Sequence, residues 1–215
     1  VTVRLAGTLS GGGGPMAKAG PDKPNSKMWG AVVPLPATNV FIQATGPDST
    51  VQTINARSIE LRSGAGIDAS ATFNAARNVI TTIGDVSIYG GAGQAGSNGA
   101  RIGGIGGTTL GQTNLTLNAG GNLLVHGGTV NGASLGSSGP STQSNTITVS
   151  AANVTLESEG TGARIGASNQ TPVPAGQINV TASGNLQVGA GTAIRANGAI
   201  TLTANSLKND GTITN

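Results

Sequence analysis

Residues 113–130 read TNLTLNAGGNLLVHGGTV, and the same pattern returns in residues 177–194, QINVTASGNLQVGAGTAI, with matching residues 63 positions apart. In this alignment Leu115 falls on Ile178, and the Gly-Asn-Leu triplet falls on itself. Apolar residues occupy every second position, which is the alternation of half-buried strands and not the 3.6-residue period of a helix. Because the match recurs at a fixed spacing, the chain is expected to be an array of similar units.

Composition favours strands and turns over helices. Gly supplies 37 of the 215 residues, whereas aromatic residues supply 2% and charged residues 9%. Each Gly costs a helix about 1 kcal/mol relative to Ala, and Thr, Asn and Ser side chains compete for helical backbone groups. So few large side chains cannot fill a wide core, but Val, Ile and Leu can fill the narrow core of a solenoid. The sequence therefore predicts an all-β fold of the parallel β-helix type.

Matching runs return only after a whole coil or more, so equivalent strands are expected to stack directly on one another. A meander of hairpins would instead show two-residue Asn-Gly or Asp-Gly turns between successive runs. We predict about seven coils, which at ~4.8 Å per stacked strand form a rod on the order of 35 Å long. The later coils are expected to begin near residues 78, 113, 146, 177 and 199.

Short separators between the runs contain Gly, Asn or Asp and suit tight corners with positive φ. An Asn that precedes an apolar residue can bond a neighbouring backbone or the Asn of the next coil. Alternatively, each Asn is simply a turn residue, which predicts the same fold. Such Asn residues occupy positions 39, 78, 114, 122, 153 and 185. Longer separators are expected to be surface loops, and they span 92–112, 132–144 and 167–176.

The chain divides into residues 1–36, a strand plus a loop excursion rich in Gly and Pro, and residues 37–215, the β-helix repeats. Val1–Leu5 alternates and fits the last strand of a preceding coil. Pro-rich and Gly-rich chain contributes few ladder hydrogen bonds. We therefore predict that residues 10–38 lie over the side of the rod.

Charge and cysteine content narrow the classes of partner. The net charge is +3 and the isoelectric point is about 9.8, but the basic residues are scattered and no aromatic residues interleave with them. Nucleic acid is therefore not an expected partner. Without cysteine the chain forms neither a disulfide framework nor a thiolate metal site. No leader precedes Val1 and no apolar run approaches the ~18 residues of a membrane span, so we expect a soluble piece.

Acidic residues and the single histidine are the candidates for catalysis. Glu157 and Glu159 are two residues apart on one face, a spacing compatible with paired-carboxylate chemistry. We interpret them as solvated charges, because the offset alignment places only Tyr89 opposite Glu157. His126 aligns with Gly189, is expected to have no cysteine and no carboxylate near it, and is interpreted as an outward residue at a strand end. We predict no catalytic, cofactor-binding or metal-binding residues and no cofactor.

Lysine and aromatic side chains outside the repeats are the best candidates for partner contact. Three of the four lysines and the only tryptophan lie in the Gly/Pro-rich excursion. Two other aromatic rings fall on the outward phase of their strands, where a loop, a partner or a sugar can meet them. Glu60 and Arg62 also share an outer face, and we expect a weak surface pair. The predicted partner-contact residues are Lys18, Lys23, Lys27, Trp29, Phe41 and Tyr89.

The repeats, with SIELRSGAGIDAS at 58–70 and ITLTANSLKNDGTITN at 200–215, resemble the repeat regions of filamentous-haemagglutinin-like exoproteins of Gram-negative bacteria. The resemblance covers roughly residues 37–215 and rests on the style of the repeat. It implies a right-handed parallel β-helix, two-partner secretion through an outer-membrane barrel transporter, and adhesion, filament formation or a toxin stalk. The family's NPNL and NPNGI secretion segments are absent, so we expect an internal stretch that carries no transferable functional residue.

These observations favour a structural or adhesive segment of a large secreted protein, located at the bacterial cell surface or outside the cell. Its expected partners are a receptor or glycan on a host or neighbouring cell, together with end-to-end contacts between rods. One alternative is a carbohydrate-binding or carbohydrate-cleaving β-helix, such as a lyase or a phage tailspike, which predicts an acidic groove with aromatic platforms. Another alternative is a filament subunit that assembles on its own.

Overall fold

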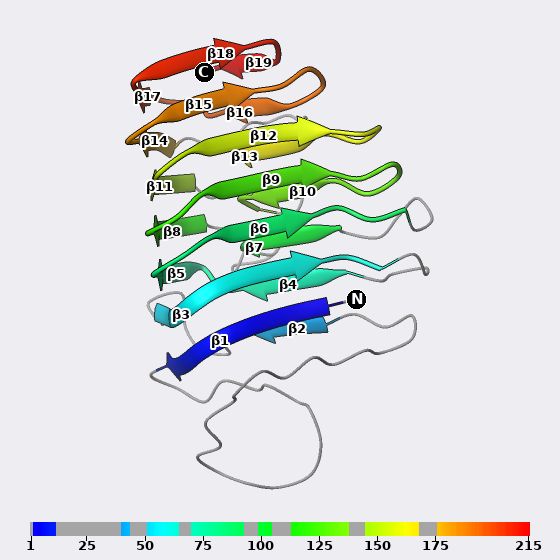
Figure 1. Cartoon of the computed structure of the whole chain (residues 1–215), viewed down its shortest axis with the longest axis vertical. Helices are drawn as coiled ribbons and strands as arrows, with labels where there is room; N and C mark the ends of the chain where they lie inside the picture. Colours follow the sequence, from blue (N-terminus) through cyan, green and yellow to red (C-terminus); the bar gives the residue numbers. More distant parts are fainter. Residues whose placement is uncertain are drawn as a thin grey trace, which may run out of the picture.

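The computed structural model describes residues 2–11, 40–43, 51–64, 70–92, 99–104, 113–137, 145–167 and 176–215, with side chains from residue 51 onward except Asn145. Every regular element within these residues is a strand, and none is a helix. From β4 onward, each strand pairs in parallel with the strand three places further along the chain (Figure 1). The all-β, parallel, solenoid-like stack that the sequence predicts is confirmed. Three consecutive strands make one coil.

The strands fall into three series, and each series stacks upward through the molecule (Figure 1). The first series contains β5 (Arg77–Thr82), β8 (Thr113–Ala119), β11 (Asn145–Ala151), β14 (Gly176–Ala182) and β17 (Ile200–Thr203). The second contains β6 (Val86–Tyr89), β9 (Leu123–Gly127), β12 (Val154–Ser158), β15 (Asn185–Val188) and β18 (Ser206–Asn209). The third contains β2 (Val40–Gln43), β4 (Ala71–Asn74), β7 (Ala100–Gly103), β10 (Ala133–Leu135), β13 (Ala163–Gly166), β16 (Ala193–Arg195) and β19 (Thr212–Thr214).

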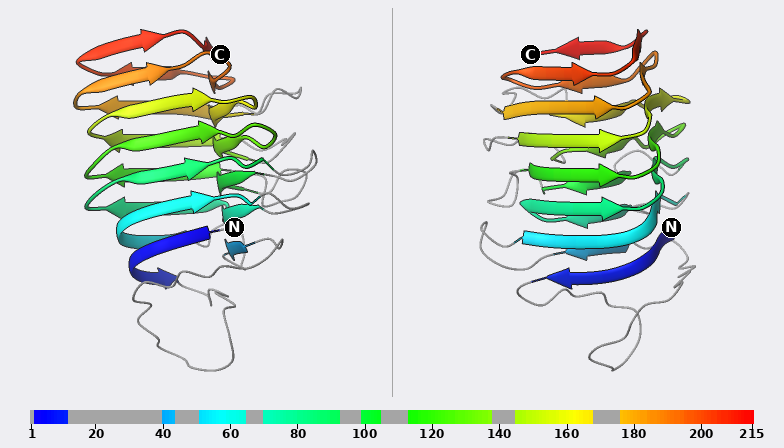
Figure 2. Two further views of the ribbon diagram at one scale, coloured as in Figure 1. Left: turned by 45° about the vertical axis from the view of Figure 1, so that its right-hand side comes forward. Right: turned by 60° about the vertical axis from the view of Figure 1, so that its left-hand side comes forward.

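A long strand, β3 (Val51–Arg62), joins the first two series, because it pairs with β5 over its first half and with β6 over its second. The resulting sheet has twelve strands and curls around the core, as both views in Figure 2 show. Beneath it, β1 (Thr2–Gly11) pairs antiparallel with β3. The prediction that Val1–Leu5 ends a preceding coil is therefore wrong, since such a strand would run parallel to β3. Period-two alternation carries no information about strand direction.

The 63-residue repeat spans two coils, as the strand register shows. Leu115 of β8 pairs with Ile147 of β11, which in turn pairs with Ile178 of β14. The first-series strands begin at residues 77, 113, 145, 176 and 200, within one residue of the predicted coil starts. Two of the predicted loops contain short strands, however, because β7 lies within 92–112 and β10 within 132–144. Residues 93–98, 105–112 and 138–144 of those separators lie outside the described residues.

Aliphatic side chains from all three series fill the interior between the sheets. Leu117, Val149 and Val180 stack on one another in register, and each is at most 1% exposed. Burying one such side chain stabilises the fold by about 1.5–3 kcal/mol. Phe73 of β4 is fully buried and is the largest of the fully buried side chains. The core is therefore a narrow column of single aliphatic layers, as expected from a chain with few aromatic residues.

A ladder of side-chain hydrogen bonds follows the corner before the second series. Asp85 Oδ1 accepts from the backbone N–H of Asn122 at 2.7 Å, and Asn153 Nδ2 donates to Asn122 Oδ1 at 2.8 Å. Asn153 Oδ1 accepts from the backbone N–H of Asn185 at 2.8 Å, and Ser206 Oγ donates to Asn185 Oδ1 at 2.7 Å. The predicted bonding of Asn between coils is confirmed at these positions, where it links five successive strands.

Two other Asn positions differ from the prediction. Asn78 points into the core, is 1% exposed and donates from Nδ2 to the carbonyl of Ala75 at 3.0 Å. It pairs in register with Gln52, which is also buried, so this part of the interior contains adjacent amides. Asn114 lies within β8 and not at a corner. Asn39 lies outside the described residues.

Positive φ occurs at the ends of third-series strands and not at the Gly-Asn corners where we expected it. Gly136 has φ of 142°, and the glycines that pair beside it in the neighbouring coils also have positive φ. A Cβ at Gly136 would lie 2.3 Å from the carbonyl oxygen of Gly166. At the corners, glycine is needed for close stacking instead: a Cβ at Gly184 would lie 2.4 Å from Asn153 Oδ1.

Candidate functional site

Only one of the six predicted partner-contact residues has a described side chain. Lys18, Lys23, Lys27 and Trp29 lie outside the described residues, as do residues 12–38 of the predicted excursion 10–38. The first two residues of that excursion, Ser10 and Gly11, belong instead to β1. Phe41 lies in β2, at the register position of Thr72 in β4, and its side chain is not described. Tyr89 ends β6, and its side chain is at the outer surface, as predicted. It is therefore the starting point for the described site.

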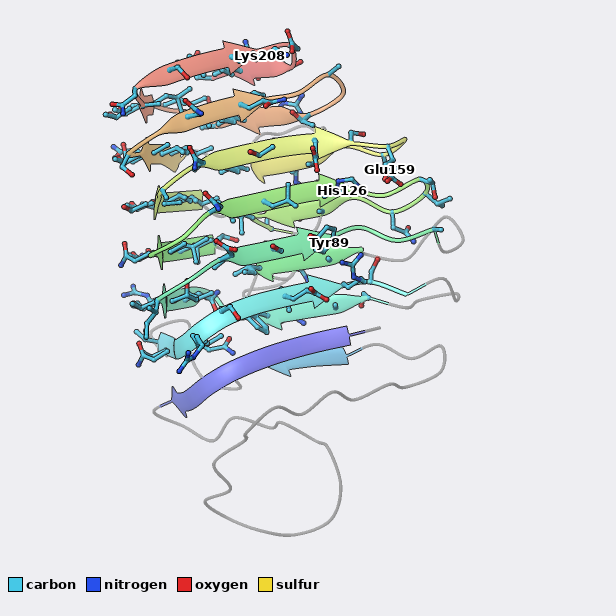
Figure 3. The ribbon with its side chains drawn as sticks, in the orientation of Figure 1. Tyr89, His126, Glu159 and Lys208 are labelled. Carbon is cyan, nitrogen blue, oxygen red and sulfur yellow. The ribbon has the colours of Figure 1, made fainter. Side chains whose placement is uncertain are left out.

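Tyr89 belongs to an outer row that crosses four second-series positions. It pairs in register with Arg62 of β3 on one side and with His126 of β9 on the other, and His126 pairs with Glu157 of β12. Side chains alternate across a strand, and the preceding residues on these strands are buried core residues. The four side chains therefore share the outer face. Figure 3 shows Tyr89, His126 and Glu159 close together on that face, toward the carboxyl ends of the strands.

Each side chain in the row contacts the next. The guanidinium carbon of Arg62 lies 3.8 Å from the centroid of the Tyr89 ring, a cation–π distance. The rings of Tyr89 and His126 are 5.7 Å apart and tilted by 51°. At the start of the row, Arg62 Nε lies 3.6 Å from a Glu60 carboxylate oxygen, which confirms the predicted surface pair. Tyr89 is thus held between a cation and an imidazole.

His126 lies between two carboxylates. Its Nδ1 is 2.9 Å from Glu157 Oε1, and its Nε2 is 3.3 Å from Glu159 Oε1. A neutral imidazole has one N–H donor, whereas the protonated ring has two. Both contacts are therefore hydrogen bonds at the same time only when His126 carries a positive charge. The interpretation of His126 as an outward strand-end residue is confirmed, but the statement that no carboxylate is near it is wrong.

The contact between His126 and Glu157 could have been predicted from the sequence, but not from the 63-residue alignment. That alignment compares His126 with Gly189, two coils away, and omits the coil between them. The single-coil spacing is 31 residues here, and it places Glu157 directly beside His126. Asn122 and Asn153 mark the same spacing at the preceding corner. Comparing adjacent coils predicts the contact that comparing alternate coils misses.

The cluster combines a cation–π pair, an imidazole and two carboxylates whose side chains are 46% and 58% exposed. Such an arrangement presents hydrogen-bond acceptors to a ligand beside an aromatic ring. Both ring nitrogens of His126 face carboxylate oxygens, so the imidazole bridges Glu157 and Glu159. In the described part of the chain, no group of three or more His, Cys, Asp or Glu side chains is arranged to hold a metal ion.

Comparison with protein-family models, with curated proteins and with solved structures finds no match. None of the described residues belongs to a helix long and apolar enough to cross a membrane. The resemblance to filamentous-haemagglutinin-like exoproteins therefore rests on the style of the repeats alone.

Proposed function

We propose that this chain is a rigid segment of a secreted bacterial surface protein, a right-handed β-helix of about seven coils that displays loops for attachment. The observation that supports this proposal best is that the ends of three separators between strands lie along the same corner of the stack. Segments 105–112, 138–144 and 168–175 each follow a third-series strand and precede a first-series strand, so their ends are anchored along one corner of the stack. Connecting segments whose ends lie in a row along a regular repeat are typical of repeat proteins that bind through their loops.

The stack has the properties of a stiff support. Parallel backbone ladders connect successive coils in all three series, and the aliphatic core is continuous from β3 to β17. The corner ladder from Asp85 to Ser206 adds side-chain bonds along the same axis. In a repeat protein each coil contacts only its neighbours, so this uniform stacking fixes the spacing between successive separators.

A cell-binding assay tests the display of loops. Fluorescently labelled chain is incubated with cultured epithelial cells and with Gram-negative cells, beside a variant whose three separators are replaced by Gly-Ser segments of equal length. A matched control carries Asn118→Ser and Thr201→Ser on the outer face of the first series, where both residues are exposed. We expect the loop variant to lose binding while its circular dichroism spectrum and melting temperature stay unchanged. Undiminished binding by a folded loop variant would refute the proposal.

Export and assembly belong to the same proposal. The family resemblance supports secretion through an outer-membrane barrel transporter, attachment to a receptor or glycan, and end-to-end association of rods. Electron microscopy and light scattering over a concentration series test the association. Fibres that lengthen with concentration support it, whereas a strictly monomeric rod at the highest concentration counts against it.

A carbohydrate-cleaving β-helix is the second candidate, and the His126 cluster is the observation that favours it. Glu157 and Glu159 lie together on an outer face beside Tyr89, where a polysaccharide can approach. A cleavage screen over acidic and neutral polysaccharides compares the native chain with Glu157→Gln, Glu159→Gln and the control Glu60→Gln. Cleavage that is lost in the first two variants and kept in the control supports catalysis. The absence of cleavage of every polysaccharide in the screen contradicts it.

A further inference from the structure

Three arginines lie close together on the outer face of the third series, away from the His126 cluster. Arg101 of β7 and Arg164 of β13 occupy the same register position, with Ser134 of β10 between them. Arg195 lies on β16, in the coil next to that of Arg164. It pairs with Gly166, so it is offset along the strand by two residues from the position opposite Arg164. Stacked strands are ~4.8 Å apart, so side chains as long as arginine bring their charges together along this column.

The exposed fraction of the arginines is lowest at Arg101. Arg101 is 2% exposed, whereas Arg164 and Arg195 are partly exposed. Fully buried arginine is rare unless it is paired. The partial exposure of Arg164 leaves the column accessible to solutes there, with Arg195 in the next coil and Arg101 two coils away on the other side.

Neutral oxygen atoms accept the hydrogen bonds that the guanidinium groups of Arg101 and Arg164 donate. Arg101 donates to the carbonyls of Gly103 and Gly104 and, at 2.8 Å, to Asn74 Oδ1. Arg164 donates from Nη2 to the carbonyl of Ser137 at 2.6 Å. The Nε atoms of Arg101 and Arg164 are both buried and have no hydrogen-bond partner. These two buried N–H donors leave the column short of acceptors.

The electrostatics of the column show the same deficit of negative charge. Burial, and then the charge of Arg164, lowers the pKa of Arg101 to about 10. Burial, and then the charge of Arg195, lowers the pKa of Arg164 to about 10. Both groups stay charged at neutral pH, so like charges face one another where the solvent screens them poorly. An anion in the column removes this repulsion and supplies the missing acceptors.

We propose that this arginine column binds an oxyanion, a phosphate or sulfate group, at Arg164 with Arg101 and Arg195 on either side. The planar guanidinium matches the oxygen atoms of such groups, and charge-assisted hydrogen bonds to them are short and strong. Arg164 is partly exposed, so its guanidinium is the group that the anion engages first. This proposal does not rest on the proposed attachment function or on the His126 cluster.

Anion titrations of the intact chain test the proposal. Inorganic phosphate and inorganic sulfate are titrated against sodium chloride at equal ionic strength, with the melting temperature and isothermal calorimetry as readouts. Methyl phosphate and methyl sulfate form a second arm. Binding of the methyl esters as tight as that of the free ions indicates a phosphorylated or sulfated ligand, whereas binding of the free ions alone indicates an inorganic anion.

Variants locate the site. Arg164→Gln and Arg195→Gln are each expected to weaken phosphate binding about tenfold or more, because a charge-assisted bond is lost. Arg77→Gln on β5 is the matched control, since Arg77 is exposed on the first series, and it is expected to bind as the native chain does. Arg164→Lys keeps the charge and provides a second variant if Arg164→Gln does not fold. The proposal is overturned if chloride stabilises the chain as much as phosphate does, or if the folded Arg164 and Arg195 variants bind phosphate normally.

Discussion

Replacing Asn153 with alanine removes the middle residue of the corner ladder. The change eliminates the 2.8 Å bond from Asn153 Nδ2 to Asn122 Oδ1 and the 2.8 Å bond from the Asn185 backbone N–H to Asn153 Oδ1. Each net hydrogen bond contributes ~0.5–1.5 kcal/mol, and both bonds are exposed, so water replaces part of what is lost. We expect the free energy of unfolding to fall by about 1–2 kcal/mol.

In a chain of this length, about 1 kcal/mol shifts the melting temperature by about 2–4 °C, so the expected decrease is about 2–8 °C. Thermal melts and urea denaturation, both followed by circular dichroism at 218 nm, measure it. Asn118→Ala is the matched control, because Asn118 is exposed on the outer face of β8 and takes no part in the ladder. Asn153→Asp keeps the acceptor for the Asn185 N–H and loses the donor to Asn122, so it is expected to cost about half as much.

A double-mutant cycle identifies the ladder as the cause. Asn122→Ala and Asn153→Ala together are expected to cost less than the sum of the single changes, since the two amides bond directly. Additive costs, or an Asn153→Ala melt no lower than that of Asn118→Ala, would refute the idea that the ladder stabilises the stack.

Three further changes test the core, the third series and the outer row. Phe73→Ala removes the largest buried side chain, and we expect the free energy of unfolding in urea to fall by ~3–5 kcal/mol. The control Thr201→Ala, at an exposed position, is expected to cost less than about 0.5 kcal/mol. A cost below about 1 kcal/mol for Phe73→Ala would contradict the burial of Phe73. Gly136 has positive φ, and Gly136→Ala places a Cβ 2.3 Å from the Gly166 carbonyl oxygen. We therefore expect this variant to melt at a lower temperature than the native chain. An unchanged melting temperature would count against this conformation. His126→Ala removes the imidazole that contacts Glu157 and Glu159. Because those carboxylates are about half exposed, the cost is expected to stay below about 1 kcal/mol and to shrink in 0.5 M sodium chloride. A cost that is independent of salt would exclude charge pairing as the cause.

Strand phase was predictable from this sequence because the core is narrow and nearly uniform. Inward positions contain Leu, Ile or Val with polar neighbours, so the alternation alone assigns the faces of residues such as Leu115 and Ile147. Asn78 contradicts this rule, since its amide is buried beside Gln52. Its burial depends on the pairing of β3 with β5, which the local pattern does not show.

Contacts between coils were harder to predict than faces. The pairing of His126 with Glu157 requires the length of the coil between them, and the longer 63-residue repeat concealed it. The arginine column requires the register of short third-series strands, two of which lie within segments predicted to be loops. The antiparallel direction of β1 depends on the chain that returns to β3. In each case the missing information was a distance along the chain and not a residue preference.

The antiparallel strand β1 makes the two ends of the described stack different. It covers β3, the strand from which both the first and second series begin, whereas β17 and β18 are the last described strands of the same curled sheet and lie together at the opposite end (Figure 1). A parallel edge presents rows of N–H and C=O groups to the next coil, and an edge already occupied does not. The edge of β3 that β1 occupies is therefore closed to a further parallel coil, so the described stack has one capped end.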